Sequence, residues 1–236
     1  MKHFVRAAAF AAAVSLVAGC ASQQASLAGA GALSPETAGP WHSLFNGRTI
    51  DQWRGYQNRD ISGWHVVNGT ITKDTITADL ITRNRYANFE LEIDWRISKG
   101  GNSGIFYRAS EEYDHIYWSA PEYQLLDDAN APDGKNRLTA VGAVYAVYPS
   151  PAGIMKPAGE WNSTRIFVNG NHVEHWLNGK KLLEYDLGSA DWAARVKNSK
   201  FSAWPNYGKG TIGYIGIQGD EEGDVSIRNI RIRELH

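Results

Sequence analysis

Residues 89–97 read F-E-L-E-I-D-W-R-I, and this stretch decides the fold class. Apolar residues alternate strictly with charged ones, which is the pattern of a β-strand with one buried and one solvated face. A helix would instead repeat its apolar residues every three or four positions. The carboxylates Glu90, Glu92 and Asp94 share the solvated face. We expect an outer-face row of charges there, although carboxylate pairs on a strand also serve β-sandwich glycosidases.

The chain around this strand repeats the same pattern of short strands and turns. Asn-Gly pairs at 169–170 and 178–179 separate alternating runs and predict hairpins. The apolar parity changes near Arg228-Asn229, which predicts a β-bulge. One short helix is expected over 189–197, with Ser189 as its N-cap. These elements predict an all-β fold, an antiparallel sandwich or jelly roll with one short helix.

The N-terminus resembles a bacterial lipoprotein leader. A short basic region precedes the apolar run 7–17, which is too short to span a bilayer as a mature helix, and small residues then lead to Cys20. We expect residues 1–19 to be a signal peptide, Cys20 to carry the lipid, and residues 20–40 to form a flexible tether. Ala21, rather than Asp, follows the cysteine. We therefore expect a lipid anchor in the bacterial cell envelope, in the outer membrane and facing the periplasm.

The composition argues against nucleic-acid binding. Lysine and arginine number 24 against 25 aspartate and glutamate residues, which gives a formal net charge of −1. A nucleic-acid-binding domain usually carries a clear basic excess. Cys20 is the only cysteine, so the mature domain has no disulfide and no thiolate metal site. Residues 41–236 are long enough for one domain with its own core.

A second stretch, from Gly100 to Asp128, carries the candidate site. It begins G-G-N-S-G-I-F-Y-R and ends P-E-Y-Q-L-L-D-D, and both halves resemble strands. Glu122 and Gln124 lie two residues apart, so on a strand they point to the same face. Arg108 ends the preceding run, and we expect the acid, the amide and the guanidinium to converge. Such a set suits an uncharged, hydroxyl-rich ligand better than a phosphate.

Seven short motifs run in one order through nearly all of residues 41–235. They are L-F-N-G (44–47), N-F-E-L (88–91), G-N-S-G-I-F-Y-R (101–108), P-E-Y-Q-L-L-D (121–127), K-P-A-G-E-W-N (156–162), H-V-E-H-W-L-N-G (172–179) and R-N-I-R-I (228–232). Together they resemble the 3-keto-disaccharide hydrolase family. The resemblance implies a concanavalin/LamG-like antiparallel β-sandwich whose concave sheet binds a sugar.

The resemblance also implies a reaction. Oxidation of a sugar at C3 makes the C2 proton acidic, and the leaving group on C1 lies β to the carbonyl. A base takes the C2 proton, the aglycone leaves, and water adds back. Such a site needs a carboxylate or imidazole base and an electrophile. We assign Glu122 as the base with His175 as the next candidate, and Arg108, Asn102 and Gln124 as groups that bind or polarise the sugar.

Four further residues are predicted to bind the substrate. Ser103 lies in a bend that can present backbone N–H groups, and Tyr145 can stack on a sugar. Lys156 lies in a loop with proline and glycine, and Gln218 matches a glutamine of the family. A structural brace between Lys156 and Glu160 is the alternative for that loop.

Arg108 and His175 also have plain structural alternatives. Arg108 can simply pair with Glu122, which would lower the pKa of the carboxyl and disfavour a base. His175 shares parity with Val173 and Leu177, so it can be a hydrogen-bonded histidine of the sandwich interior.

One turn departs from the family. Relatives commonly carry Gln-Asp-His-Gly before the last strand, whereas residues 218–224 read Q-G-D-E-E-G-D. The histidine is missing and carboxylates take its place. Carboxylates suit hard cations, so the turn is a candidate site for Ca²⁺ or Mg²⁺, with a solvated charged turn as the alternative.

Two other functions stay open at this point. The protein can be a non-catalytic carbohydrate-binding lipoprotein that uses the same face, or a conventional β-sandwich glycoside hydrolase that uses the Glu90 strand. The expected partners are a carbohydrate and, through the lipid, a membrane.

Overall fold

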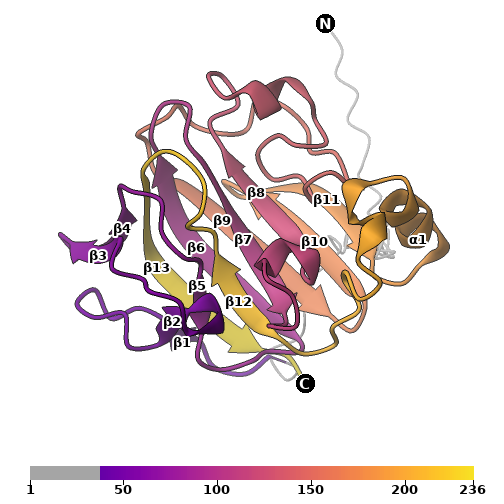
Figure 1. The fold of residues 1–236 in the computed structure, drawn as a ribbon, viewed down its shortest axis with the longest axis horizontal. Coiled ribbons are helices and arrows are strands. Elements are labelled where there is room, and N and C mark those ends of the chain that lie inside the picture. The colour runs from indigo at the N-terminus through magenta and orange to yellow at the C-terminus, as the bar shows by residue number, and fades with distance from the viewer. Residues whose placement is uncertain (1–37) are drawn as a thin grey trace, which may run out of the picture. The chain divides into compact units, whose positions relative to one another are not determined.

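Two antiparallel β-sheets form the framework of residues 38–236, the part of the chain that a computed structural model describes (Figure 1). The larger sheet runs in the order β11 (Lys180–Asp186), β10 (His172–Leu177), β9 (Asn162–Asn169), β6 (Phe89–Ile97), β13 (Val225–Glu234), β4 (Thr70–Lys73) and β3 (Trp64–Val67), and β1 (His42–Ser43) also pairs with β13. The smaller sheet runs β2 (Trp53–Gly55), β5 (Leu80–Thr82), β12 (Tyr214–Ile217), β7 (Asn102–Ala109) and β8 (Glu122–Leu126).

The inner faces of the two sheets form one apolar core. The odd-numbered side chains of β6, such as Leu91 and Trp95, pack with Ile105 and Tyr107 of β7 in a single cluster of buried residues. The alternation read from residues 89–97 is therefore confirmed, because every apolar residue of that strand is buried. This is the predicted β-sandwich.

The carboxylates on the outer face of β6 are paired with side chains of neighbouring strands. Glu90 accepts hydrogen bonds from Arg165 and Arg233, and Glu92 accepts one from Arg231 Nε at 2.7 Å. Asp94 accepts one from Asn229 Nδ2 at 2.7 Å. The row is thus a cross-strand charge ladder.

Local signals of the sequence are found where they were predicted. Hairpins join β9 to β10 and β10 to β11. The register of β13 against β6 shifts between Arg228 and Arg231, where Asn229 has a φ of 50°. Helix α1 (Ala190–Lys197) begins after Ser189, whose Oγ accepts from the Trp192 N–H at 3.1 Å.

The described chain begins already paired. Ala38 forms a bridge with Leu235, and the Gly39 N–H donates to the Glu234 carbonyl oxygen at 2.8 Å. The predicted signal peptide, Cys20 and most of the predicted tether lie outside the described residues. Within residues 38–236, no helix has the length and apolar character to cross a membrane.

Candidate active site

A small polar pocket opens on the smaller sheet, on the face turned away from the larger sheet. Its volume is about 220 Å³, below the range typical of drug-sized ligands and suited to one sugar ring. Polar and aromatic side chains line it: Asn102, Tyr117, Glu122, Gln124, Asp133, Tyr145, Lys200, Gln218 and Glu221. Four of the predicted substrate-binding residues and the predicted base thus lie together.

The strand register explains this convergence. In the β7–β8 pair, Gln124 lies opposite Gly104 and Glu122 lies opposite Phe106. The odd-numbered residues Ile105 of β7 and Tyr123 of β8 point into the core. Glu122 and Gln124 therefore point to the opposite face of the smaller sheet. A Cβ at Gly104 would come within 2.2 Å of Glu122 Oε1. Glycine at this position therefore leaves the space that the carboxyl occupies.

Amide side chains lie next to the Glu122 carboxyl. With its oxygen and nitrogen assigned from the hydrogen-bond network, the Gln124 amide donates to Glu122 Oε1 at 2.9 Å and to the Ser103 carbonyl oxygen at 3.3 Å. In this orientation the Gln124 amide oxygen accepts from the Asn102 side-chain amide at 3.1 Å. Gln218 is 4% exposed, and its Oε1 has no hydrogen-bond partner within residues 38–236. A buried acceptor of this kind suits a substrate hydroxyl.

The electrostatics of the pocket favour a proton-transfer role for Glu122. Burial raises the pKa of this carboxyl from its ordinary 4.5 to about 8. The Lys200 ammonium opposes the shift, whereas Glu221 and Asp220 add to it. A general base works best when its pKa lies near the working pH. Perturbed carboxyls in clefts mark candidate functional sites.

Lys200, Asp133 and Glu221 were not singled out from the sequence as residues of this pocket. Lys200 comes from the 3₁₀ turn η5 (Lys200–Ala203), and its Nζ lies 4.3 Å from the Tyr145 ring centroid. The Tyr145 hydroxyl donates to Asp133 Oδ2 at 3.0 Å. The Lys200 ammonium is the one cation in the pocket lining, and it can polarise a carbonyl or stabilise an enolate oxygen.

The acidic turn beside the pocket contains an internal cation. Lys73 is fully buried, and its Nζ donates to the Gly219 carbonyl oxygen at 3.3 Å and to the Glu221 carbonyl oxygen. Burial lowers the pKa of Lys73, while Glu221, Asp220 and other acids raise it. An ammonium bound to two carbonyls of the turn would repel a metal cation there. The arrangement of the turn therefore does not suit the predicted Ca²⁺ or Mg²⁺ ion.

Comparison with known proteins identifies the family. The model of the 3-keto-α-glucoside-1,2-lyase-like domain matches residues 40–233. The chain belongs to this family. A curated relative, the 3-keto-disaccharide hydrolase of Bacteroides thetaiotaomicron, is 38% identical over 234 residues, which cover 85% of this chain and 80% of that protein. The resemblance of the seven sequence motifs is thereby confirmed.

Solved structures agree with this family and fold. A candidate glycosyl hydrolase from Parabacteroides distasonis is 34% identical, with a TM-score of 0.78 over 87% of this chain and 99% of that one. A Bacillus subtilis protein with a galectin-like fold is 11% identical, with a TM-score of 0.53 over 85% of this chain and 98% of that one, and shows the fold alone. The chain is thus a β-sandwich of a carbohydrate-active family.

Arg108 does not line the Glu122 pocket. The register of β7 against β12 shifts between Ala109 and Phe106, and Arg108 has a φ of 54°. This β-bulge turns its side chain away. Arg108 Nε donates to the Ala87 carbonyl oxygen at 2.8 Å, and its Nη2 donates to the Gly170 carbonyl oxygen at 2.8 Å. The expected convergence of Arg108 with Glu122 and Gln124 was therefore wrong.

His175 lies on the opposite face of the smaller sheet from Glu122. It is fully buried between the sheets, 2.9 Å from the Tyr107 hydroxyl and 2.9 Å from the Gly142 carbonyl oxygen. Burial lowers its pKa to about 4. The structure thus shows the hydrogen-bonded interior histidine that its parity suggested, and His175 does not line the pocket.

Ser103 and Lys156 also lie outside the pocket lining. Ser103 is buried, and its Oγ donates to the Gln218 carbonyl oxygen at 2.9 Å, so it fixes the backbone of Gln218 directly after β12. Lys156 is exposed, and its Nζ donates to the Trp161 carbonyl oxygen at 2.9 Å. Lys156 therefore braces its own loop, with the backbone of Trp161 rather than Glu160 as the partner.

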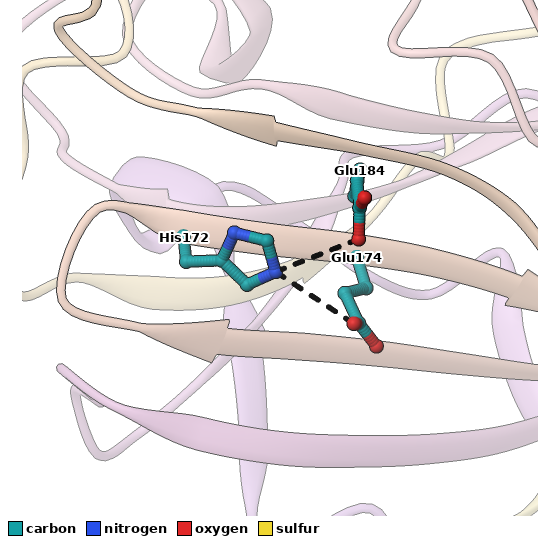
Figure 2. Close-up of side chains that lie close together, drawn as sticks. All are labelled: His172, Glu174 and Glu184. Atoms are coloured by element: carbon teal, nitrogen blue, oxygen red, sulfur yellow. Dashed lines mark ion pairs between the residues drawn. The ribbon is translucent and has the colours of Figure 1, made fainter. Parts of the chain in front are cut away.

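The larger sheet offers a further cluster of possible metal ligands, formed by His172, Glu174 and Glu184 (Figure 2). His172 Nε2 lies 3.6 Å from Glu174 Oε1 and 3.9 Å from Glu184 Oε2. Lys181 Nζ already contacts both carboxylates, at 3.4 Å and 2.6 Å. The cluster is thus a cross-strand network of ion pairs in which lysine supplies the positive charge.

A more voluminous hollow, about 830 Å³, lies on the outer face of the larger sheet. Its carboxylates, Glu92 and Asp94, are those already bonded to Arg231 and Asn229. Both carboxylates are only half-buried. The smaller Glu122 pocket is therefore the better candidate for the chemistry.

Proposed function

We propose that this protein hydrolyses 3-keto-glycosides in the Glu122 pocket. One observation carries the proposal: a buried carboxyl with a pKa of about 8 lies in a polar, sugar-sized pocket beside a lysine. The names of the family and of the Bacteroides relative support a 3-keto sugar as the substrate. The family reaction needs a base for the C2 proton and a group that stabilises an enolate, and both residue types are present.

In the proposed first step, the Glu122 carboxylate takes the proton from C2. The C–H electron pair moves towards the C3 carbonyl, whose oxygen becomes an enolate oxygen. Lys200 and the Asn102 amide supply donors in the same pocket. Binding of the sugar hydroxyls by Gln218 Oε1 would hold C2 towards the carboxyl.

In the second step, the enolate returns its electrons, a C1–C2 double bond forms and the C1–O bond breaks. The aglycone leaves with a proton from water or from a protonated side chain. Water then adds to C1, and C2 regains a proton, for which protonated Glu122 is the nearest source. The net reaction is hydrolysis, with no change in the oxidation state of the sugar carbons taken together.

The test is incubation with a 3-keto-disaccharide and, separately, with its unoxidised parent. Turnover of the keto form alone, with deuterium exchange at C2 in D₂O, is the expected result. Turnover of both sugars would instead support a conventional glycoside hydrolase. Saturable binding of the keto sugar without exchange or turnover would support the carbohydrate-binding alternative.

We also propose that the protein is anchored at the periplasmic side of the cell envelope through Cys20. The support is the leader-like residues 1–19 and the position of Cys20 directly after small residues. Bacterial lipoproteins carry more than one acyl chain, and two anchoring signals give stable retention. Cys20→Ser should abolish incorporation of a labelled fatty acid; label on the mutant protein would contradict the assignment.

A further inference from the structure

A second cavity, separate from the Glu122 pocket, lies among α1, η5 and the loop 204–211. Its volume is about 580 Å³, which is in the range of small-molecule sites. The turn η5 forms the partition, since Lys200 lines the Glu122 pocket and Phe201 lines the second cavity. We call it the aromatic cavity after four lining residues: Trp192, Phe201, Trp204 and Tyr207.

Three of these rings lie in nearly parallel planes. Phe201 and Tyr207 have centroids 4.1 Å apart and an interplanar angle of 3°. Tyr207 and Trp192 have centroids 5.7 Å apart, also at 3°. Trp204 is held by stacking on Trp118, at 4.9 Å and 15°. Phe201 and Tyr207 stack on each other and are 1% and 2% exposed, so a ligand meets this wall through edge-to-face contacts. Such contacts also favour a flat aromatic ring, because they add to the burial of apolar area.

The charges in this wall have one sign. Arg108, Lys197 and Lys209 line the aromatic cavity, and no aspartate or glutamate does. Arg108 is 5% exposed and forms no ion pair within residues 38–236. Its hydrogen bonds go to uncharged oxygens of Ala87, Asn88 and Gly170, and none uses Nη1.

A buried guanidinium usually has an anionic partner, because removing its charge from water is costly. A guanidinium also stays protonated at neutral pH, so it cannot avoid that cost by losing a proton. The Tyr207 hydroxyl, on a residue that is 2% exposed, likewise has no partner within the described chain. An acid, Glu112, lines only a smaller cavity of about 230 Å³ that shares Arg108, and Ser110 and Asn206 already donate to it.

We propose that the aromatic cavity binds a planar aromatic carboxylate, with its rings against Phe201, Tyr207 and Trp204 and its anion at Arg108. The guanidinium suits a carboxylate because it presents N–H donors in one plane. The two lysines at the edge would attract the anion from solution. This site does not depend on the chemistry assigned to Glu122.

The first test compares 2-naphthoate with 2-naphthamide, which has the same shape and no charge. Isothermal titration and quenching of tryptophan fluorescence are measured on the full mature chain. Saturable binding of the naphthoate is expected, with the amide weaker by roughly 10- to 100-fold because hydrogen bonds to charged groups are the stronger ones. Equal affinities, or no saturation of the naphthoate at millimolar concentration, would overturn the proposal.

The second test fills the aromatic cavity with a larger side chain. Ala193 is an exposed residue of α1 that lines the cavity, whereas its exposed neighbour Ala194 does not. Ala193→Trp should abolish naphthoate binding, and the matched control Ala194→Trp should retain it. Both variants should keep wild-type turnover at the Glu122 pocket. Unchanged naphthoate binding in Ala193→Trp would refute the site.

Two further variants separate this site from the Glu122 pocket. Arg108→Gln should weaken naphthoate binding at least as much as replacing the naphthoate by the amide does. If Arg108→Gln does not fold, Ala193→Trp remains the test of the site. Glu122→Gln should bind naphthoate like the wild type. Loss of naphthoate binding in Glu122→Gln, or its displacement by a keto sugar, would place the ligand in the other pocket and refute the proposal.

Discussion

Replacing Glu122 with glutamine should stabilise the protein while it removes turnover. The carboxyl is 5% exposed, and burial raises its pKa from 4.5 to about 8. The unfolded chain therefore releases this proton at lower pH than the folded chain does. It follows that the stability contributed by protonated Glu122 is present below pH 4.5 and is lost as the pH rises towards 8. Glutamine has the shape of the protonated acid and does not titrate.

The size of the effect follows from the shift. One pKa unit corresponds to 1.36 kcal/mol, so Glu122→Gln should raise the free energy of unfolding by about 1 kcal/mol at pH 5 and about 3 kcal/mol at pH 7. The gain should level off at about 5 kcal/mol above pH 8. At pH 7 this corresponds to a rise in Tm of about 6–12 °C for a domain of this size. Loss of the base should lower kcat by roughly 10²–10⁴.

The assay is urea unfolding of both proteins at several pH values between 5 and 9, together with kcat on a keto sugar. Glu222→Gln is the matched control, because Glu222 lies in the adjacent turn and is exposed. Its difference from the wild type should stay within about 0.5 kcal/mol at every pH. A Glu122→Gln difference that does not grow between pH 5 and pH 8 would refute the assignment of a raised pKa. Near-normal kcat would move the base to another residue.

Three further predictions concern the same pocket. The kcat/KM of the wild type should rise with pH and level off above pH 8, because the base must be ionised; a profile that is flat between pH 6 and 9 would contradict this. Gly104→Ala should lower kcat by about 10²-fold, since the new Cβ, 2.2 Å from Glu122 Oε1, displaces the carboxyl; crystal structures and kinetics of the variant would check it. Lys73→Met should lower the free energy of unfolding in urea by about 1–3 kcal/mol and should lower kcat/KM, because it leaves two carbonyls of the turn without a donor. Chelators should change neither the Tm nor the kcat of the wild type.

Strands and hairpins could be predicted from the sequence because their causes are local. The apolar period of two in residues 89–97 depends only on the chain and on the presence of one core. The Asn-Gly turns allow positive φ, as found at Asn178 and Gly179. Ser189 caps α1 with its own side chain. Each of these features needs no knowledge of distant residues.

The position of Arg108 could not be predicted in the same way. Its parity with Gly104 and Phe106 places it on the Glu122 face of an unbroken strand. The bulge exists because β7 pairs with β12, with Tyr214 opposite Ala109 and Gly216 opposite Phe106. The β12 strand follows more than 100 residues later in the chain. Residues 105–111 contain no glycine or proline that would indicate a β-bulge.

Half of the pocket was predictable for a related reason. Glu122, Gln124 and Asn102 come from two neighbouring strands, and their spacing or motif marked them. Lys200 and Asp133 come from short 3₁₀ turns, which have no apolar period and whose position depends on tertiary packing. A charged residue in such a turn is usually solvated, so the sequence gives no reason to choose it.

The acidic turn shows how a correct chemical argument can select the wrong cation. Carboxylates at Asp220, Glu221 and Glu222 do require positive charge if they are to lie close to one another. The sequence pointed to hard metal ions as the partner because carboxylate oxygens are the ligands that such ions prefer. The fold instead brings Lys73 from β4 beneath the turn, next to the strand that follows it. An ammonium fixed by the sheet organises the turn in every folded molecule, whereas a metal would do so only at sufficient concentration. The position of Gln218 and Glu221 in the pocket thus depends on a residue of the sheet itself.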